Sequence, residues 1–356
     1  SVITGKVAQT KMEARRIQKI IIAGNGMTAW MAAAAIGNAV QGQRVEISVI
    51  GDEPEPANHI EPSLPISLAF NQRLGIDERD LMRKTSASFT LGTQFKDWPE
   101  PGNQYFLPIA PHGASIEYVH FHNYAIKARQ AGDATPFNDY SLNAVAARHG
   151  KFAHPVMEQD SIFSTLAYGH HFNGKAYTDY MRSYAQAHGA VAINDPIASI
   201  QRRADDGFIE SVTLSGGETL GADLFLDCSG ASAVLSGEQS AFEEWSKWLP
   251  ANRVISATAS SAAPDPFSGI TALDACWHLR VPARNTVEHR LVYCREYLDD
   301  DEARNVLLSC AGDETLSSFT VTDLRQGRRK SPWKGNCIAL GAAAGAIEPL
   351  GGTRLA

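Results

Sequence analysis

The feature that most constrains this chain is an apolar run that leads directly into a glycine turn. Residues 18 to 30 read QKIIIAGNGMTAW, and the run Ile20 to Ile22 predicts a buried strand. The mostly alanine segment from Trp30 to Val40 predicts the helix that follows, and a second apolar run, Val45 to Ile50, predicts another strand. This order predicts a β-α-β unit with the glycine turn at the carboxyl end of its first strand.

The residues of the turn indicate what it binds. Gly24 allows a tight turn, Gly26 lets the backbone approach a ligand closely, and Ala29 is small enough for the helix to pack on the strand. The helix is expected to start near Met27, so the free N–H groups around Met27 and Thr28 would hold a pyrophosphate. The turn therefore predicts a flavin or nicotinamide dinucleotide site, and the alternative is an ordinary α/β turn.

The acid that holds the adenosine ribose is expected just after the second strand. Ile50 is followed by Gly51, so Asp52 and Glu53 come slightly late in the sequence. Either carboxylate is able to reach the 2′-hydroxyl, or both are simple turn residues.

Composition excludes several classes of protein. The chain has 356 residues, 44% apolar and 20% charged, with a net charge of -7. That length allows two domains, or one α/β domain with an inserted lobe. A soluble globular protein without a basic face is expected, with no nucleic acid as partner. No apolar run approaches the roughly 20 residues that span a bilayer, and the N-terminus has no signal-peptide core.

Cysteine and histidine usage argues against metal sites. The 5 cysteines are scattered and lack metal-ligand spacing, so we expect reduced thiols in a cytoplasmic protein. His170 and His171 lie in a group of histidines and aromatics, but their spacing predicts no metal site either.

Further elements follow from periodicity and turn residues. A Pro-rich loop is expected from Glu53 to Pro65, and Asp77 is expected to cap a helix within Leu74 to Phe89. Other expected helices are 118–129, 177–189 and 300–308, and expected strands are 190–200, 208–214, 219–227, 275–281, 289–296 and 337–340.

Two later segments repeat the strand-to-turn pattern. Leu224 to Asp227 predicts a strand that enters the small-residue turn Cys228 to Ser232, and Asn336 to Gly345 predicts a strand that enters a glycine-rich helix start containing Gly341 and Gly345. Flavin monooxygenases of the hydroxybenzoate hydroxylase type place three such segments in this order. The resemblance implies an α/β fold with a Rossmann-like FAD/NAD(P)-binding domain and an inserted mixed-sheet substrate lobe.

Longer motifs resemble the flavin-dependent tryptophan halogenases. They are GNGMTAWMAA, the block from Leu74 to Trp98, AYGHHFNG, DCSG and NCIALGAAAGAIEPL, in the order of that family, and the similarity runs from about Ile20 to Thr353. The resemblance implies FAD used as FADH2, a separate NAD(P)H:flavin reductase as partner, and chloride or bromide. Hypohalous acid formed there would reach an indole-like aromatic substrate through a tunnel.

The same resemblance implies how the chain is divided. FAD-binding segments are expected at 18–75, 166–235 and 331–356, and substrate-lobe segments at 76–165 and 236–330. The family continues past the position of Ala356 into a helical region that caps the substrate pocket, so we expect that region to be absent or replaced by a partner subunit, as in a homodimer.

The chain departs from the family at its catalytic pair. Thr90 stands where the family has its lysine, and Gly351 stands where it has a glutamate, while Glu348 is retained. A neutral hydroxyl neither forms a haloamine nor donates from a cationic amine, and glycine has no side chain to act as a base. The resemblance therefore leaves no catalytic residue assigned in this chain.

Other motif positions are matched in part. Gly352 and Thr353 fall in the family's halide-binding run, where Arg354 replaces a glycine. Trp277 begins WHLRVP, which corresponds to the WxWxIP motif but has Leu279 in place of the second tryptophan; the alternative role for Trp277 is in a core strand.

The segment IEPSLP corresponds to the loop that lies beside the flavin in the family, through Glu61 and Pro65. The hypothesis is thus a halogenase-like protein that uses reduced FAD and oxygen. The alternatives are an aromatic hydroxylase and a flavin-binding paralogue without activity.

Overall fold

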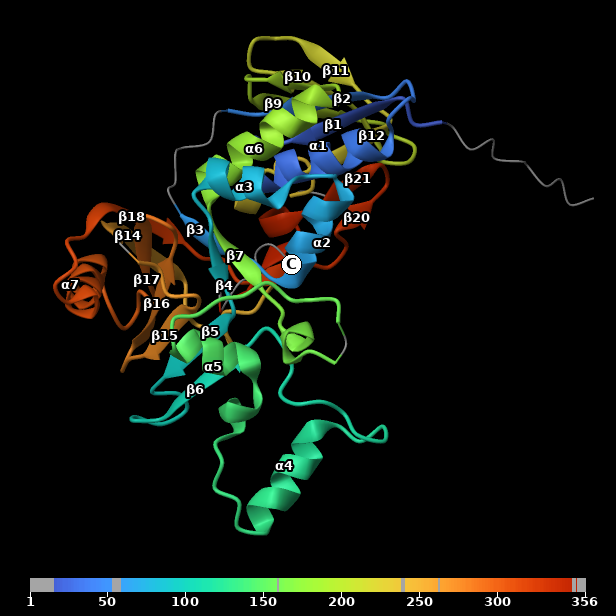
Figure 1. Cartoon of the computed structure of the whole chain (residues 1–356). Coiled ribbons are helices and arrows are strands. Elements are labelled where there is room, and N and C mark those ends of the chain that lie inside the picture. The colour runs from blue at the N-terminus through green and yellow to red at the C-terminus, as the bar shows by residue number, and fades with distance from the viewer. Residues whose placement is uncertain are drawn as a thin grey trace, which may run out of the picture.

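The computed structural model describes residues 16–52, 59–158, 160–237, 241–261, 263–347 and 350. Figure 1 shows two large sheets side by side, with a smaller three-stranded sheet running between them. The chain crosses between the two large sheets several times, so each sheet is assembled from segments far apart in the sequence.

The first large sheet has six strands and contains the glycine turn. Its order is β20 (Trp333–Lys334), β21 (Cys337–Ala339), β12 (Leu224–Asp227), β1 (Lys19–Ala23), β2 (Glu46–Ile50) and β8 (Ala190–Ile193). The pairs from β21 to β8 are parallel, and only β20 is antiparallel to its neighbour. The predicted β-α-β unit is confirmed, with α1 (Met27–Ala39) between β1 and β2.

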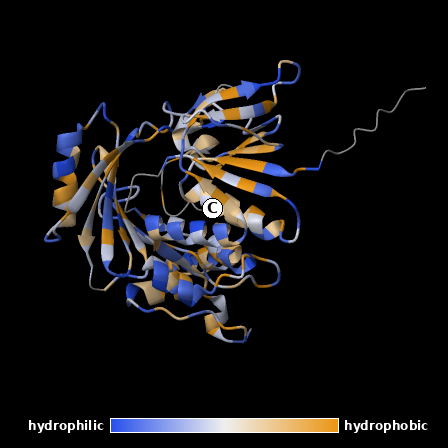
Figure 2. Ribbon diagram, turned by 90° about the horizontal axis from the view of Figure 1, so that it is seen from above, coloured by the Kyte–Doolittle hydropathy of each residue, from blue (hydrophilic) through white to orange (hydrophobic). Residues whose placement is uncertain are grey.

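Both faces of this sheet are buried. Ile20 and Ile22 pack toward α1 and α6 (Gly174–Ala187), while Ile21 and Ala23 pack on the opposite face. Strands buried on both faces read as continuous apolar runs, and the strands of this sheet are mostly orange in Figure 2. The alanines of α1 let it lie close to the sheet and to α6, because they add little side-chain volume.

The opposite face is covered by a three-stranded antiparallel sheet. It consists of β11 (Thr219–Gly221), β10 (Ile209–Leu214) and β9 (Ile197–Arg202). The hairpin between β10 and β11 is confirmed, but the strand expected over 219–227 is two strands, β11 and β12, and β12 lies in the six-stranded sheet. The single strand expected over 190–200 is instead two strands, β8 and β9, because Asp195 and Pro196 interrupt it.

The second large sheet has seven strands. Its order is β18 (Ser317–Asp323), β14 (Arg253–Ser260), β17 (Thr286–Tyr293), β16 (Cys276–Pro282), β15 (Ser268–Ala272), β5 (Gly92–Lys96) and β6 (Gln104–Pro108). Helix α7 (Asp300–Ala311) packs on one face and starts with a capping box between Asp299 and Glu302.

The small connecting sheet joins β3 (Ile60–Pro62), β7 (Gly169–Asn173) and β4 (Ser88–Thr90). Asp77 caps α3 (Glu78–Thr85) as expected. The prediction of helix up to Phe89 is wrong, since the helix ends at Thr85 and β4 begins three residues later. Pairing with β7 takes precedence over helical spacing in this short segment.

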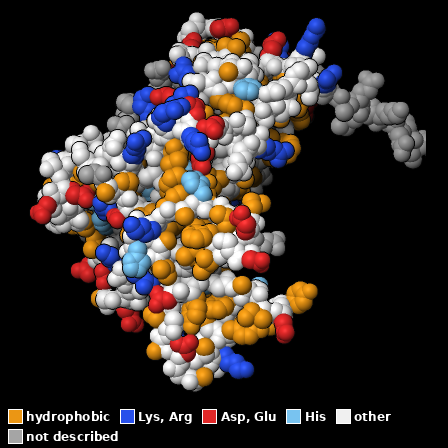
Figure 3. Space-filling model, in the orientation of Figure 1, with side chains coloured by type: hydrophobic (Ala, Val, Ile, Leu, Met, Phe, Trp, Pro, Cys, Tyr) orange, Lys and Arg blue, Asp and Glu red, His pale blue; other side chains and the backbone are white. Residues whose placement is uncertain are grey.

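The remaining elements are α2 (Pro65–Arg73), α4 (Phe121–Gln130), α5 (Leu142–Arg148), β13 (Phe242–Glu244), β19 (Gly327–Arg329), β22 (Gly345–Ala346) and four short 3-10 helices, η1 (Phe137–Tyr140), η2 (Ile162–Thr165), η3 (Gly230–Ser232) and η4 (Gly341–Ala343). Helix α4 projects away from both sheets in Figure 1. Hydrophobic side chains gather on the lower half of the face in Figure 3. Between residues 116 and 163, the exposed large hydrophobic residues include Ile116, Tyr118, Val119, Ile126, Met157, Ile162 and Phe163. Within the described ranges, no helix has the length and apolar character to cross a bilayer.

Candidate functional site

The glycine turn lies between the carboxyl ends of β12 and β2. Gly24 has φ +111°, and a Cβ placed on it would lie 2.4 Å from the carbonyl oxygen of Cys228. Its N–H donates to the carbonyl of Ile50 at 2.7 Å. Only glycine fits this conformation and this close approach, so Gly24 is required by the sheet itself.

The start of α1 is open to a ligand. Gly26 is the N-cap, and among the described residues no side chain caps the helix and no heavy atom lies within 4 Å of a Cβ placed on Gly26. The first turn, which starts with Met27 and Thr28, holds no acidic residue. Free N–H groups and the positive end of the helix dipole favour an anion at this point.

Two further residues fix the start of α1 on the sheet. Ala29 is fully buried against the sheet, as its small size predicted. Trp30 is also fully buried, and its indole Nε1 donates to Asn25 Oδ1 at 2.7 Å. Sequence reasoning missed this bond, which ties the middle of the glycine turn to the helix it precedes.

Asp52 lies just beyond the end of β2, with its side chain exposed. Gly51 packs against the turn, since a Cβ on it would lie 3.2 Å from the carbonyl carbon of Gly24. Asp52 thus follows the strand next to the turn, at the edge where a ribose acid is expected, while Glu53 lies outside the described residues.

The late glycine segment meets the same edge. Gly341 has φ +59°, and a Cβ on it would lie 2.8 Å from Thr28 Oγ1, so η4 sits against the start of α1. The prediction of a helix start over 341–346 is wrong, because η4 ends at Ala343 and Gly345 lies in β22, paired with β19. Gly345 approaches the backbone of Gly327 too closely for a side chain.

The middle segment is held by Asp227, which is fully buried at the end of β12. Its carboxylate accepts five hydrogen bonds, from the N–H and hydroxyl of Ser229, the N–H of Leu235, and the N–H and hydroxyl of Ser236. These bonds fix the turn that faces Gly24. Asp227 therefore has a structural role at this edge of the sheet, because both of its carboxylate oxygens accept hydrogen bonds from the protein.

Strand β3 carries Glu61 and is anchored from the second large sheet. Arg290 on β17 is buried, and its Nη2 donates to the carbonyl of Ile60 at 2.6 Å and to Glu288 at 2.7 Å. Glu288 in turn accepts from the N–H of Ile60 at 2.5 Å and lies 2.7 Å from His59 Nδ1. Glu61 Oε1 lies 3.8 Å from Arg290.

A pocket of about 380 Å³ opens beside Thr90. Its walls come from the segment after β3, from β4 to β6 and from the start of β15, and its lining residues are Pro62, Ser63, Leu64, Pro65, Thr90, Gly92, Thr93, Leu107, Pro108, Ile109 and Ser268. Pro65 and Thr90, singled out separately in the sequence, thus share one cavity. The Thr90 hydroxyl donates to the carbonyl of Gly92 at 3.2 Å.

Trp277 lies elsewhere. It is buried in β16, in a core cluster with Ile60 and Leu279, and is not among the described residues that line the Thr90 pocket. Glu348, Gly351, Gly352, Thr353 and Arg354 lie outside the described residues.

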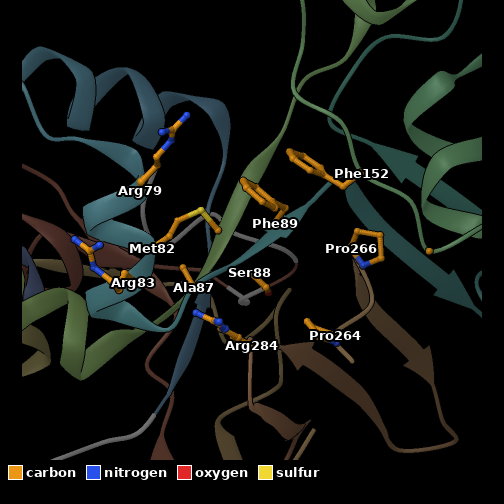
Figure 4. Close-up of a pocket in the computed structure, with 11 residues that line it drawn as sticks. Arg79, Met82, Arg83, Ala87, Ser88, Phe89, Phe152, Pro264, Pro266 and Arg284 are labelled. Carbon is orange, nitrogen blue, oxygen red and sulfur yellow. The ribbon is translucent and has the colours of Figure 1, made fainter. Parts of the chain in front are cut away.

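A second pocket, of about 480 Å³, lies by the other face of β4. Phe89 is next to Thr90 in β4, so their side chains point to opposite faces of the strand. Phe89 stacks on Phe152 with ring centroids 3.8 Å apart, and Figure 4 shows the two rings side by side. Arg79, Arg83 and Arg284 also line this pocket and are labelled in Figure 4. Within the described ranges, no group of three or more His, Cys, Asp or Glu side chains is placed to hold a metal ion.

Sequence reasoning missed the side chains that support the Thr90 pocket from behind. His171 bonds the lining residue Ser268 across 97 residues of sequence, and Arg290 reaches Ile60 across 230. The pair His170 and His171 was visible in the sequence, but nothing local pointed to its partners.

Comparisons with known proteins agree with this architecture. The family model for tryptophan halogenase matches residues 19–356. The tryptophan 7-halogenase KtzQ of Kutzneria sp. (strain 744) is 27% identical over 97% of this chain and 68% of its own length.

Two solved structures are similar over 96% of this chain and 69% of their own length. BrvH, a flavin-dependent halogenase from Brevundimonas sp. BAL3, is 34% identical with a TM-score of 0.89. Xcc4156, a flavin-dependent halogenase from Xanthomonas campestris, is 31% identical with a TM-score of 0.91. The predicted α/β fold of the FAD-binding type is confirmed by this likeness.

Proposed function

The chain belongs to the tryptophan halogenase family, and from that premise we propose that it uses reduced FAD and oxygen to modify an indole-like aromatic substrate in the Thr90 pocket. The observation that carries the proposal is the shared cavity of Thr90 and the Pro62 to Pro65 segment, which follows the strand anchored by Arg290. A separate NAD(P)H:flavin reductase would supply the reduced flavin, because the sequence contains a single dinucleotide turn.

The residues present fit FAD. Gly26 leaves the uncapped start of α1 open, which suits a pyrophosphate, and Asp52 lies at the neighbouring strand end, which suits a ribose hydroxyl. Gly341 packs closely against Thr28, because it has no side chain. Bound there, the reduced flavin would supply the electrons that activate oxygen, which is redox chemistry that the side chains lack. The 5 free cysteines suit a cytoplasmic protein.

The Thr90 pocket suits an apolar ring more than a charged group. Leu64, Leu107 and Ile109 line it together with prolines, and no Lys, Arg, Asp or Glu is among the described lining residues. The chain's own contribution is therefore to bind and orient a flat substrate and to exclude water around it.

Halogenation and hydroxylation make different demands on Thr90. Halogenation needs a donor that polarises hypohalous acid, and the Thr90 hydroxyl already donates to Gly92. Hydroxylation of the ring needs no such donor, and this favours it as the second candidate. A paralogue that binds flavin without turnover is the third.

One experiment separates these functions. The purified chain is supplied with FADH2 from a reductase, with oxygen, with chloride or bromide, and with a panel of indoles, and the products are identified by mass spectrometry. A halogenated product supports halogenation and an oxygenated product supports hydroxylation. Release of peroxide with unaltered indole contradicts both.

A paired variant tests the lost catalytic groups. Thr90→Lys with Gly351→Glu should create or raise halogenation, because a cationic donor and a base would then be available at these motif positions. Thr90→Lys with Gly351→Gln is the matched control, since it lacks the base. No gain in the first variant would mean that these positions do not limit the reaction.

A further inference from the structure

Ser268 is the lining residue of the Thr90 pocket whose environment is most completely defined. It is the first residue of β15, pairs in register with Thr93 on β5, and has a side chain that is almost fully buried. Ser268 nevertheless lines the pocket.

His171 fixes the direction of the Ser268 hydroxyl. His171 Nδ1 lies 2.7 Å from the carbonyl oxygen of Pro282, and a carbonyl only accepts, so Nδ1 carries the proton. Its Nε2 then has a free lone pair, and this atom lies 3.0 Å from Ser268 Oγ. The Ser268 hydroxyl must therefore donate to His171.

His171 remains an acceptor at neutral pH. It is fully buried, and burial lowers the pKa of its imidazole from 6.5 to about 4, although the carbonyl of Pro282 acts in the opposite direction. The neutral ring holds the single proton on Nδ1. The bond from Ser268 is thus present near neutral pH.

With its proton engaged, Ser268 offers lone pairs alone to a ligand. Thr90 behaves in the same way, because its hydroxyl donates to Gly92. The three prolines of the lining have no N–H. Ser268 and Thr90 are thereby matched to a substrate that brings its own donor, whereas Ser63 Oγ accepts from the N–H of His170 and keeps its own proton.

We propose that Ser268, oriented by His171, is the acceptor that selects an aromatic substrate with a ring N–H or O–H and fixes the ring's orientation in the pocket. This inference rests on the proposed function, since it assumes that the pocket holds the aromatic substrate. Ser268 determines specificity by direct contact, and His171 is a positioning residue that acts through it.

The test compares two ligands of the same shape. Indole has a ring N–H, and benzothiophene has a sulfur in its place. Competition binding to the purified chain, followed by ligand-observed NMR, should give a preference for indole of about three- to tenfold, the range expected for one neutral hydrogen bond. No turnover is needed.

Variants then test whether Ser268 and His171 cause the preference for indole. Ser268→Ala should bring the ratio of the two affinities close to one, and Ser268→Thr should restore the preference because it keeps the hydroxyl. His171→Phe should also reduce the ratio, since the freed hydroxyl can then donate to other groups. Ser256→Ala is the matched control, because Ser256 is a buried serine of the same sheet that bonds Thr320 instead of lining the pocket.

The outcomes separate this inference from the function on which it rests. Equal binding of both ligands to the unaltered chain, or an unchanged preference in Ser268→Ala, overturns the role of Ser268 and leaves the aromatic pocket in place. Failure of the unaltered chain to bind either ligand overturns both. The ligand comparison on the unaltered chain stays decisive even if Ser268→Ala does not fold.

Discussion

Replacing Arg290 by methionine tests how the second large sheet holds β3 beside the Thr90 pocket. The guanidinium makes three hydrogen bonds of 2.6 to 2.8 Å, two to Glu288 and one to the carbonyl of Ile60. Methionine keeps the apolar stem but leaves Glu288 as a buried charge without its cation. Breaking a buried pair from one side costs about 3–5 kcal/mol of unfolding free energy.

The dependence on pH identifies the cause of that loss. Burial acts to raise the pKa of Glu288, but the charge of Arg290 and the hydrogen bond with His59 outweigh it and lower the pKa from 4.5 to about 2. The folded value is below the unfolded one, so the stability that this carboxylate contributes is present above about pH 4.5 and is lost as the pH falls toward 2.

In Arg290→Met the effect of burial is left largely unopposed, and the pKa of Glu288 should rise above its ordinary value. The variant then takes up a proton more readily than the unaltered protein. The loss of stability should therefore be larger at pH 7 than at pH 4, because it shrinks as the pH falls through the raised pKa of the variant and on toward 2.

Urea unfolding at pH 7 and at pH 4 measures both quantities. The double variant Arg290→Met with Glu288→Gln is the control, and it should recover about 1–2 kcal/mol because the buried charge is gone. A loss below about 1 kcal/mol at pH 7, or an equal loss at both pH values, would refute the reasoning.

Three further predictions concern the sheet edge and α7. Gly24→Ala should abolish folding or FAD binding, because its Cβ would lie 2.4 Å from the carbonyl of Cys228. Gly26→Ala should lower stability by no more than about 1 kcal/mol and should weaken FAD binding. Fluorescence titration measures the FAD affinity of both variants. Asp227→Asn should cost about 3 kcal/mol or more by urea unfolding, since an amide NH2 would face N–H and O–H donors; an unchanged midpoint would contradict this. Asp299→Ala should cost about 1 kcal/mol by loss of the capping box and leave FAD binding intact.

The fold near the glycine turn could be predicted because its signals are local. The strand, the turn at Gly24 and the alanine helix lie within one continuous stretch, and each has its own periodicity. The two later strand-to-turn segments could also be located in the sequence, and in the fold their strands, β12 and β21, follow β1 in the parallel part of the sheet.

The failures occur where distant pairing determines the structure. Ser88 to Thr90 continue a helical pattern in the sequence but pair with β7, whose residues lie about 80 positions later. The segment after Leu340 has the composition of a helix start, yet pairing of Gly345 with Arg328 makes it a strand. In both segments, pairing with distant strands outweighs the local secondary-structure propensity.

The residues of the candidate site also form two groups, those that a continuous motif locates and those whose roles depend on distant contacts. The glycine edge and Thr90 could be located by motif, because each motif is continuous in the sequence. The roles of Ser268 and His171 depend on the carbonyl of Pro282, which lies 111 residues from His171. Only the folded chain shows that the His171 ring donates to the Pro282 carbonyl and accepts from the Ser268 hydroxyl.

The central claim is that chemistry dependent on reduced flavin takes place in the Thr90 pocket, and filling that pocket tests it directly. Thr93→Trp places an indole in the cavity, and Thr322→Trp on the exposed edge strand β18 is the control. The measurement is the rate of product formation from indole with FADH2, oxygen and bromide, alongside FAD affinity. We predict that Thr93→Trp loses the product and keeps FAD binding, while Thr322→Trp keeps both. An unchanged rate of product formation in Thr93→Trp would contradict the claim.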